Sequence, residues 1–360
     1  MNNRKPTLLL AATLLALSTA AGAATLDELA YRWAPVHYQD TDSSDFASDY
    51  LTAVDYDGDW SGINNWDNRT RYPLKAAMYY SVVESCSHWF INYSFFHPRD
   101  WSDTIFDGEH ENDLEGVLLA VRKDGSSYGK VDGMLTIFHT DFYAYTPAGS
   151  PLLNGHETID GTLSFENDNG TLRPKTAAQS KGHGVKAWPY ITDFTGAGNQ
   201  DGVIYYPTQG DGGIPTSGND RHVPYRLINI FQSGGMWTHA LADAQISGKG
   251  TTFATWGTFR GDGGGGCGSG AKICTTDSAH APWGWDDDND GTSYRGEWAL
   301  DPAHLFNFYF DGTTFSETYL SNQYLDDMRR MGWATGHVPA GYDNKADLST
   351  MLNKLGSVCR

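Results

Sequence analysis

After residue 23 the chain lacks any long hydrophobic run, and a helix needs about 18 consecutive apolar residues to cross a bilayer. Basic residues are also scarce, with 25 Lys and Arg against 44 Asp and Glu, a formal net charge of -19. Such an acidic surface repels phosphate groups, which disfavours nucleic-acid binding and binding to anionic head groups without a bridging metal ion. The acid excess favours cations as ligands, or serves solubility in an extracellular or salty setting.

Several catalytic and cofactor signatures are missing as well. The sequence contains no G-x-S-x-G and no H-E-x-x-H motif. The glycine-rich residues 261–270 (GDGGGGCGSG) lack the Lys-Ser/Thr pair of a phosphate loop and the strand-helix frame of a dinucleotide loop. No C-x-x-C pair is present to indicate a zinc site. The sequence therefore identifies no catalytic nucleophile, and whether the protein is an enzyme stays open.

Residues 1–23 are typical of a secretory signal peptide, because Arg4 and Lys5 precede an apolar run (LLLAATLLAL) and a final Ala-Gly-Ala. They predict a mature chain that begins at Ala24 and is secreted or periplasmic. Since the two basic residues would be removed with this segment, the mature chain would carry a net charge of -21.

Four cysteines, an even number in an exported chain, favour two disulfides. They are Cys86, Cys267, Cys274 and Cys359, and three pairings are possible. Cys267 and Cys274 lie close enough in sequence to close a tight loop, which would leave Cys86 to anchor the C-terminus through Cys359.

The composition favours one all-β domain. Glycine is abundant (41 residues), aromatic residues are frequent, periodic helical stretches are scarce and no linker is evident. Residues 24–360 are therefore expected to form a single metal-binding β-sandwich with long loop insertions and a few peripheral helices. Pro302 can begin one helix, and residues 322–331 show the apolar spacing of another that ends at Gly332.

Residues 91–115 (INYSFFHPRDWSDTIFDGEHENDLE) combine an aromatic segment with a cluster of acids. His110, Asp113 and Glu115 form a His-x-x-Asp-x-Glu triplet, and Asp100 lies ten residues upstream of the histidine. If these three carboxylates and one imidazole converge, they suit Mg²⁺, Ca²⁺ or Mn²⁺. The alternative is a solvated charged loop edge, because a run of charges is usually surface.

The flanking segments predict two strands joined by a polar loop. Residues 89–96 (WFINYSFF) are rich in aromatics and end before Pro98, and residues 117–121 (VLLAV) are a short apolar run before a KDGSS turn. If the acidic segment enters the second strand, Asp113 and Glu115 lie on one face, because side chains alternate along a strand.

The same residues resemble the signature of the necrosis- and ethylene-inducing peptide-like proteins, which are secreted microbial cytolysins. That signature reads I-M-Y-S-W-Y-F-P-K-D and then G-H-R-H-D-W-E. The residues that match are Ile91, Tyr93, Ser94, Phe95, Phe96, Pro98, Arg99, Asp100, His110, Asp113 and Glu115. The resemblance implies that Asp100, His110, Asp113 and Glu115 hold a divalent metal. This sequence departs from the second block at Glu109, Glu111, Asn112 and Leu114, where the family has Gly, Arg, His and Trp.

Three further side chains could supply an extra ligand or a general base near the metal, namely His183, Glu111 and His97. His183 lies between two glycines, which allow close backbone approach and could present the imidazole from a loop, or could simply form a structural turn. His139 alternates with apolar neighbours in residues 134–145, which is more typical of a packed histidine.

Residues 286–297 (DDDNDGTSYRGE) satisfy the calcium-loop pattern D-x-[DN]-x-[DN]-G-x5-E. The pattern predicts a Ca²⁺ ion held by side-chain or main-chain oxygens of Asp286, Asp288, Asp290, Thr292 and Glu297. The flanking residues do not resemble the helices of a helix-loop-helix hand, so we expect an isolated structural calcium loop. The alternatives are an acidic turn and a loop bent over the first metal site.

Three functions are compatible with these patterns. The resemblance implies a secreted cytolysin that uses its metal to recognise a glycosylated membrane lipid or cell-surface glycan and perturbs the target membrane. A metal-dependent hydrolase of phosphodiester, lipid or glycan substrates is the second, because a bound ion can polarise an oxygen and acidify water. A calcium-dependent glycan-binding module is the third, since twelve Trp residues could stack on sugars if they are exposed.

Overall fold

The computed structural model describes residues 24–102, 109–189, 202–244, 250–262, 279–290, 294–333, 342, 348–356 and 358–359. Strands dominate this part of the chain and helices are few, which confirms the expected β-rich class. The expected signal peptide, residues 1–23, lies outside the described residues, and so do Cys267 and Cys274. None of the helices in the described part is long and apolar enough to span a membrane.

The strands and helices have the following bounds. The strands are β1 (Val36–Gln39), β2 (Ala77–Ser85), β3 (His88–Asp100), β4 (His110–Arg122), β5 (Lys130–Phe138), β6 (Asp141–Thr146), β7 (Leu153–Asn154), β8 (Ile159–Thr162), β9 (Phe165–Asp168), β10 (Thr171–Ala178), β11 (Val185–Ala187), β12 (Val203–Thr208), β13 (Val223–Asn229), β14 (Phe253–Thr255), β15 (Thr258–Phe259), β16 (Phe310–Asp311) and β17 (Tyr319–Ser321). The helices are α1 (Leu26–Trp33), η1 (Phe46–Asp49), α2 (Asn65–Asn68), α3 (Met236–Ala244), α4 (Glu297–Leu300), α5 (Pro302–Tyr309), α6 (Gln323–Arg330) and α7 (Leu348–Asn353).

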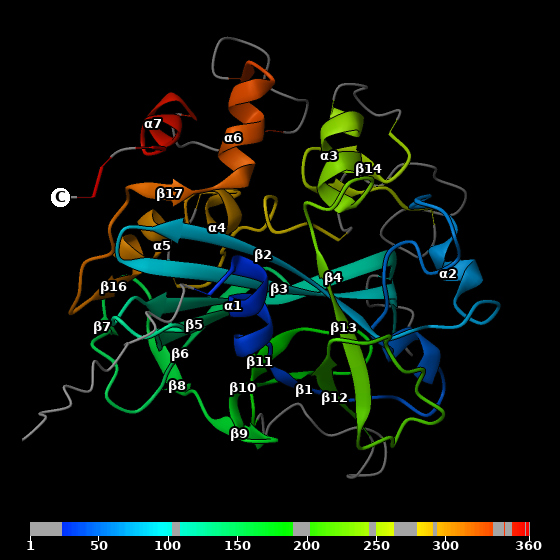
Figure 1. The fold of residues 1–360 in the computed structure, drawn as a ribbon. Helices are drawn as coiled ribbons and strands as arrows, with labels where there is room; N and C mark the ends of the chain where they lie inside the picture. Colours follow the sequence, from blue (N-terminus) through cyan, green and yellow to red (C-terminus); the bar gives the residue numbers. More distant parts are fainter. Residues whose placement is uncertain are drawn as a thin grey trace, which may run out of the picture.

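Most of the strands form one curled sheet. Its order is β11-β10-β1-β12-β13-β2-β3-β4-β5-β6-β8, with β17 also paired to β2 and β9 to β10. The sheet bends so far that β11, near one end of this order, contacts β5 and β4. The long strands β2 to β5 therefore face the short strands β1 and β10 to β12 across a half-barrel (Figure 1). A sandwich of two large sheets is not confirmed.

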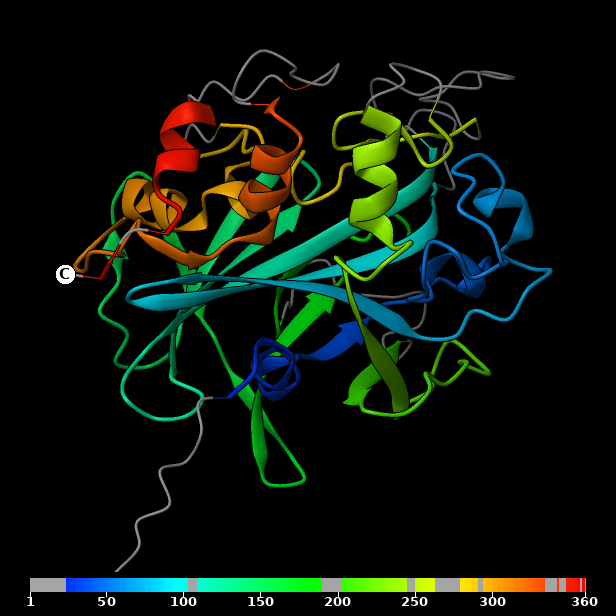
Figure 2. The same cartoon turned by 45° about the horizontal axis from the view of Figure 1, so that its top comes forward.

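Two hydrophobic cores lie on opposite sides of the long strands, because successive side chains of a strand point to opposite faces. On β4, Leu114 and Leu118 pack in the outer core with residues of α3 to α7. Val117 and Leu119 pack in the inner core with residues of α1, β12 and β13. Figure 2 shows the same division, with α3, α6 and α7 on one side of the long strands and α1 on the other.

The local patterns that predicted strands and helices are confirmed where they fall on described residues. The aromatic residues 89–96 lie within β3, and residues 117–121 lie within β4. Pro302 begins α5 as its first residue. The helix α6 is followed by Gly332 with a φ of 72°, a backbone conformation that favours glycine.

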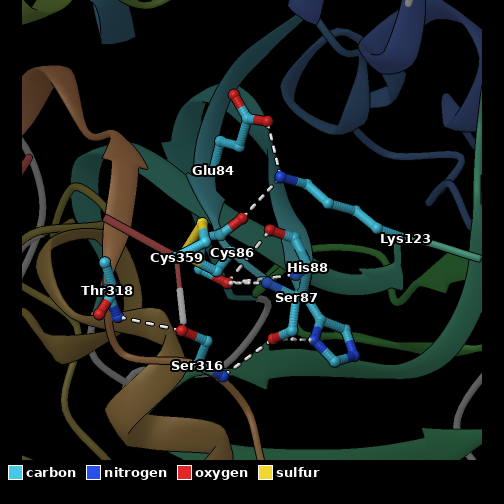
Figure 3. The surroundings of a disulfide bond; sticks show 9 residues. Glu84, Cys86, Ser87, His88, Lys123, Ser316, Thr318 and Cys359 are labelled. Carbon is cyan, nitrogen blue, oxygen red and sulfur yellow. Dashed lines mark hydrogen bonds and ion pairs between the residues drawn. A yellow bond between two sulfur atoms is a disulfide. The ribbon is translucent and has the colours of Figure 1, made fainter. Parts of the chain in front are cut away.

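A disulfide between Cys86 and Cys359 ties the C-terminus to the turn between β2 and β3, with 5.6 Å between the two Cα atoms (Figure 3). Around it, the backbone N–H of Ser316 donates a hydrogen bond of 2.8 Å to Ser87 Oγ. Lys123 Nζ lies 2.7 Å from Oε1 of Glu84, which is close to the end of β2. The disulfide between Cys86 and Cys359 confirms one of the two expected pairings.

Candidate metal centre

The candidate metal residues gather where β3 ends and β4 begins. Asp100 and His110 are directly opposite each other in the antiparallel register of these two strands. His110 Nε2 lies 3.4 Å from Asp100 Oδ2. One potential ligand atom from each of Asp100, His110 and Asp113 lies within 4.8 Å of the other two. The structure thus brings together three of the four predicted ligands.

The side chains of His110 and Asp113 both point towards Asp100. They can do so because the backbone at Asn112 interrupts the regular alternation of side chains along β4. Asn112 has a φ of 63°, a left-handed conformation that asparagine adopts more readily than most residues. Its side chain is fixed on three sides: Nδ2 donates to the carbonyls of Gly62 and Arg260, each at 2.8 Å, and Oδ1 accepts from Asn65 Nδ2 at 2.7 Å. These hydrogen bonds connect the geometry of the site to the loops around it.

A cavity of about 300 Å³ lies over these side chains. Its described lining contains no lysine or arginine and consists of Asp100, His110, Asp113, Leu114, Glu115, His139, Thr140, Ala279, His280 and Trp285. Glu115 is 4% exposed, and its Oε1 accepts the backbone N–H of His139 at 3.0 Å. Its Oε2 is buried and has no hydrogen-bond partner among the described residues. The fourth predicted ligand therefore lines the same cavity with one oxygen unsatisfied.

Two carboxylates in this cavity are costly to ionise. Burial raises the pKa of Asp100 to about 7; the imidazole of His110 opposes that rise, and the charge of Asp113 adds to it. Burial, together with the charge of Asp113, raises the pKa of Glu115 well above its usual value, against the opposing hydrogen bond from His139. Each shift means that the charged form of the carboxylate is disfavoured, chiefly because burial removes it from water. A divalent ion would stabilise the charged form.

His183 does not lie in the cavity but behind Asp113. Its Nδ1 lies 2.9 Å from Asp113 Oδ2 and its Nε2 lies 3.2 Å from Asp49 Oδ1. Burial alone would lower the pKa of His183, but the hydrogen bonds and charges of the two carboxylates raise it to about 9. Both ring nitrogens are therefore engaged, and the histidine orients Asp113.

The glycines beside His183 do allow the close approach that the sequence suggested. His183 has a φ of 52°, and a methyl group at Gly184 would lie 2.5 Å from the ring of Phe138.

His97 is fully buried and stacked on His183, with 3.7 Å between ring centroids and an interplanar angle of 4°. Its Nε2 lies 3.0 Å from Gln39 Oε1, and its Nδ1 has no described partner. Burial and the nearby charge of His183 lower the pKa of His97 well below its usual value, so its ring is neutral. His97, Asp113 and His183 form the second group in the described residues whose potential ligand atoms lie within 4.8 Å of one another. The parallel stacking of the two rings suits packing rather than joint ligation of one ion.

Glu111 is directed away from the cavity. It is 1% exposed, and its two oxygens accept the backbone N–H groups of Trp66 and Asp262, each at 2.9 Å. Burial raises the pKa of Glu111 to about 7 despite these two hydrogen bonds. The carboxylate therefore connects two loops.

We expect Glu111→Gln to lower the free energy of unfolding by about 1–3 kcal/mol, because the amide can accept only one of the two N–H groups. Its cation affinity should stay close to that of the wild type. Denaturant unfolding and calorimetric cation titration would measure both quantities, with Asp326→Asn, an exposed carboxylate on α6, as the control. A loss of cation affinity in Glu111→Gln without a loss of stability would instead assign Glu111 to the metal site.

The residues of the predicted calcium loop do not gather as the motif suggested. Asp288 and Asp290 are exposed, Asp286 is partly exposed, and Thr292 lies outside the described residues. Glu297 is buried at the start of α4, with its Oε1 3.9 Å from His304 Nε2. Among the described residues, these acids do not form a group with ligand atoms within 4.8 Å. Calcium binding by Asp286, Asp288, Asp290, Thr292 and Glu297 stays a prediction.

Two residues outside the predicted ligands and bases contribute to the site. Asp49 is fully buried and accepts hydrogen bonds from Trp101 Nε1 and the backbone N–H of Lys181, at 3.0 and 2.9 Å, as well as contacting His183. Nothing in the local pattern of η1 indicates this role. His139, which the sequence placed among packed residues, lines the cavity with its side chain 44% exposed.

Comparisons with known proteins find likeness only among solved structures, since no family model and no curated protein matches the chain. The necrosis and ethylene inducing protein 2 from the causal agent of cocoa's witches' broom disease has a TM-score of 0.30 and 16% identity, over 57% of this chain and 75% of its own. The non-toxic HaNLP3 protein has a TM-score of 0.28 and 16% identity, over 46% and 70%. NLPPya in complex with glucosamine has a TM-score of 0.28 and 17% identity, over 56% and 70%. At TM-scores this low the likeness is partial, and the assignment of the site depends on the residues of this chain.

Proposed function

We propose that the protein binds a divalent cation through Asp100, His110, Asp113 and Glu115. The bound cation would recognise the head group of a glycosylated lipid, and the protein would then perturb the bilayer that contains this lipid. The cavity beside these residues carries the proposal. Three carboxylates and three imidazoles line it, among them the four proposed ligands, and its described lining includes no lysine or arginine. A cation is therefore the ligand that this cavity suits best.

The donor set fits a hard divalent ion. Carboxylate oxygens with one neutral imidazole nitrogen suit Mg²⁺, Ca²⁺ or Mn²⁺. The buried Glu115 Oε2 has no other partner among the described residues. When bound, the ion would offer its open positions to a hydroxyl or carboxylate oxygen of a sugar.

The residues behind the ligands fix their orientation. His183 holds Asp113 Oδ2 and is itself held by Asp49, while the backbone N–H of His139 holds Glu115 Oε1. Partners of this kind usually raise the affinity of a metal site, because they hold the ligands in the binding geometry before the ion arrives. The resemblance of residues 91–115 to the necrosis-inducing signature supports a membrane glycolipid as the target.

The two alternative functions have less support. For a hydrolase, two of the three bases suggested by the sequence are engaged elsewhere, since His183 contacts two carboxylates and Glu111 accepts two backbone N–H groups. The third, His97, is fully buried behind the ligands and stacked on His183.

A glycan-binding module that stacks sugars on Trp would need exposed Trp side chains, and none of the twelve Trp residues, all of which lie in the described part of the chain, is exposed. Four Trp side chains are partly exposed. Two of them stack within the protein, Trp60 on His239 at 4.5 Å and Trp188 on Tyr38 at 4.2 Å, and the other two, Trp66 and Trp89, lie under the cations of Arg99 and Lys123.

Removal of the cation tests the proposal. Mature protein would be added to dye-loaded liposomes that contain a glycosylated sphingolipid, with and without chelator, and the lipids would be examined by mass spectrometry. We expect leakage that chelator abolishes, with intact lipids. Absence of leakage would contradict the proposal for this lipid class, and a cleaved lipid would favour the hydrolase.

A further inference from the structure

A groove of about 870 Å³ lies beside α1, which contacts β2 and β10. A smaller cavity of about 270 Å³ adjoins it, because the two share the lining residues Tyr31, Thr171, Arg173 and Thr208. In the described part of the chain, neither shares a lining residue with the cavity of the candidate metal centre. Small-molecule sites typically have volumes of roughly 300–1,000 Å³. The groove is therefore large enough for a ligand that does not contact the metal ion.

The charged side chains of the groove balance one another, although the chain as a whole carries a formal net charge of -19. The described lining of the larger part contains three carboxylates and three guanidinium groups, from Asp27, Glu28, Asp211, Arg32, Arg173 and Arg226. Since an excess of one sign is what attracts an ion of the other, the lining favours a neutral ligand. Leu227 is the one aliphatic apolar side chain in this described lining, which leaves an acyl chain or an apolar peptide side chain without a pocket.

Hydrogen bonds within the protein hold several of the polar groups in place. Arg173 is 2% exposed; its Nε lies 2.7 Å from Asp168 Oδ2, and its Nη1 donates to the carbonyl of Tyr31 at 2.7 Å. Asp27 Oδ1 accepts the hydroxyl of Tyr80 at 2.6 Å. The walls of the groove are therefore ordered before a ligand arrives, which lowers the entropic cost of binding.

Other polar groups of the groove are available to a ligand. Gln209, Asp211 and Arg226 are exposed, and their side chains make no hydrogen bond or ion pair with the described residues. They offer an amide, a carboxylate and a guanidinium group, so the groove can both donate hydrogen bonds to a ligand and accept them from it.

Aromatic rings line both parts of the groove. Tyr128 is 38% exposed, and Tyr31, which the two parts share, is partly exposed. In the smaller part, Tyr206 stacks on His222 with 4.4 Å between the ring centroids. The face of an aromatic ring carries partial negative charge and attracts groups with partial positive charge. A sugar ring presents C–H groups of this kind on its faces and hydroxyls at its edges.

We propose that this groove binds a neutral oligosaccharide independently of the metal centre. The sugar rings would stack on Tyr31 and Tyr128, while their hydroxyls donate to Asp211 and accept from Arg226. A hydroxyl can do both, which matches the mixed donors and acceptors of the lining. The proposal goes beyond the recognition of a lipid head group by the bound cation, because no cation takes part.

Calorimetric titration of the mature protein with three neutral tetrasaccharides, cellotetraose, chitotetraose and mannotetraose, tests this proposal. We expect at least one of them to bind, with an affinity that chelator leaves unchanged. Tyr128→Ala should weaken this binding at least about 5-fold, because a stacking face is lost. Arg226→Ala should weaken it about 10-fold, because hydrogen bonds from a charged group are lost. Tyr72→Ala, which removes a similarly exposed ring (44%) outside the groove, should match the wild type.

Both substitutions in the groove change exposed side chains, so the variants should fold as the wild type does, which circular dichroism would verify. If none of the three tetrasaccharides binds, the proposal is wrong. Binding that chelator abolishes would assign the sugar to the metal centre and would also contradict it. Wild-type affinity in both Tyr128→Ala and Arg226→Ala would show that the sugar binds elsewhere on the protein, which would overturn the proposal as well.

Discussion

Asp113→Asn is expected to lower divalent-cation affinity by about 100-fold or more and to abolish cation-dependent leakage of liposomes. Asp113 is the residue that both groups of potential ligands share. The substitution removes a negative charge from the cavity, and it also leaves His183 facing a neutral amide in place of the carboxylate oxygen that it contacts at 2.9 Å. Calorimetric titration and dye release would measure the two effects.

A matched control for this experiment is Asp326→Asn. That carboxylate lies on α6, is 49% exposed, and has a salt bridge of 4.0 Å to Arg329, which contributes little at such an exposed site. We expect cation affinity and leakage in this variant to equal those of the wild type. If Asp113→Asn folds normally and still binds the cation with wild-type affinity, the metal centre is not at Asp113, and the proposed function loses its site.

The second large effect is expected on stability. Replacing both Cys86 and Cys359 by Ser should lower the free energy of unfolding by about 2–5 kcal/mol. The bond joins residues 273 apart in sequence and so restricts the unfolded chain strongly. Guanidinium unfolding followed by Trp fluorescence would report this loss, because Trp237, Trp283 and Trp298 are buried in the outer core.

Cation binding should survive this change, which separates it from the effect of Asp113→Asn. Cys86 lies just before β3, and Asp100 ends that strand, so the two are roughly 40 Å apart along an extended strand. An unchanged unfolding midpoint would show instead that the ion pairs of Lys354 with Asp301 and Glu317 hold the C-terminal segment without the bond.

The parts of the fold that could be predicted are those encoded in neighbouring residues. The strands at residues 89–96 and 117–121 can be recognised from their aromatic and apolar composition, and Pro302 indicates the start of a helix. The curl of the sheet could not be predicted in this way. It depends on pairs such as Val36 with Lys175 and His37 with Tyr205, which are far apart in sequence.

The same distinction applies to the candidate site. Asp100, His110 and Asp113 come from adjacent strands, so their proximity follows from a local hairpin. The direction of Glu111 could not be predicted, because the left-handed backbone at Asn112 changes which side chains face the cavity. Asp49 reaches His183 only through the folded chain, 134 residues away in sequence.

The disulfide between Cys86 and Cys359 makes the stability of the fold dependent on the redox environment of the protein. Such bonds persist in oxidising compartments and are rare in the reducing cytosol. A chain kept in a reducing environment would lack this bond and would be correspondingly easier to unfold. If the chain is exported, as residues 1–23 predict, the bond would form only after the chain has left the cytosol, and oxidation at the destination would close the C-terminus.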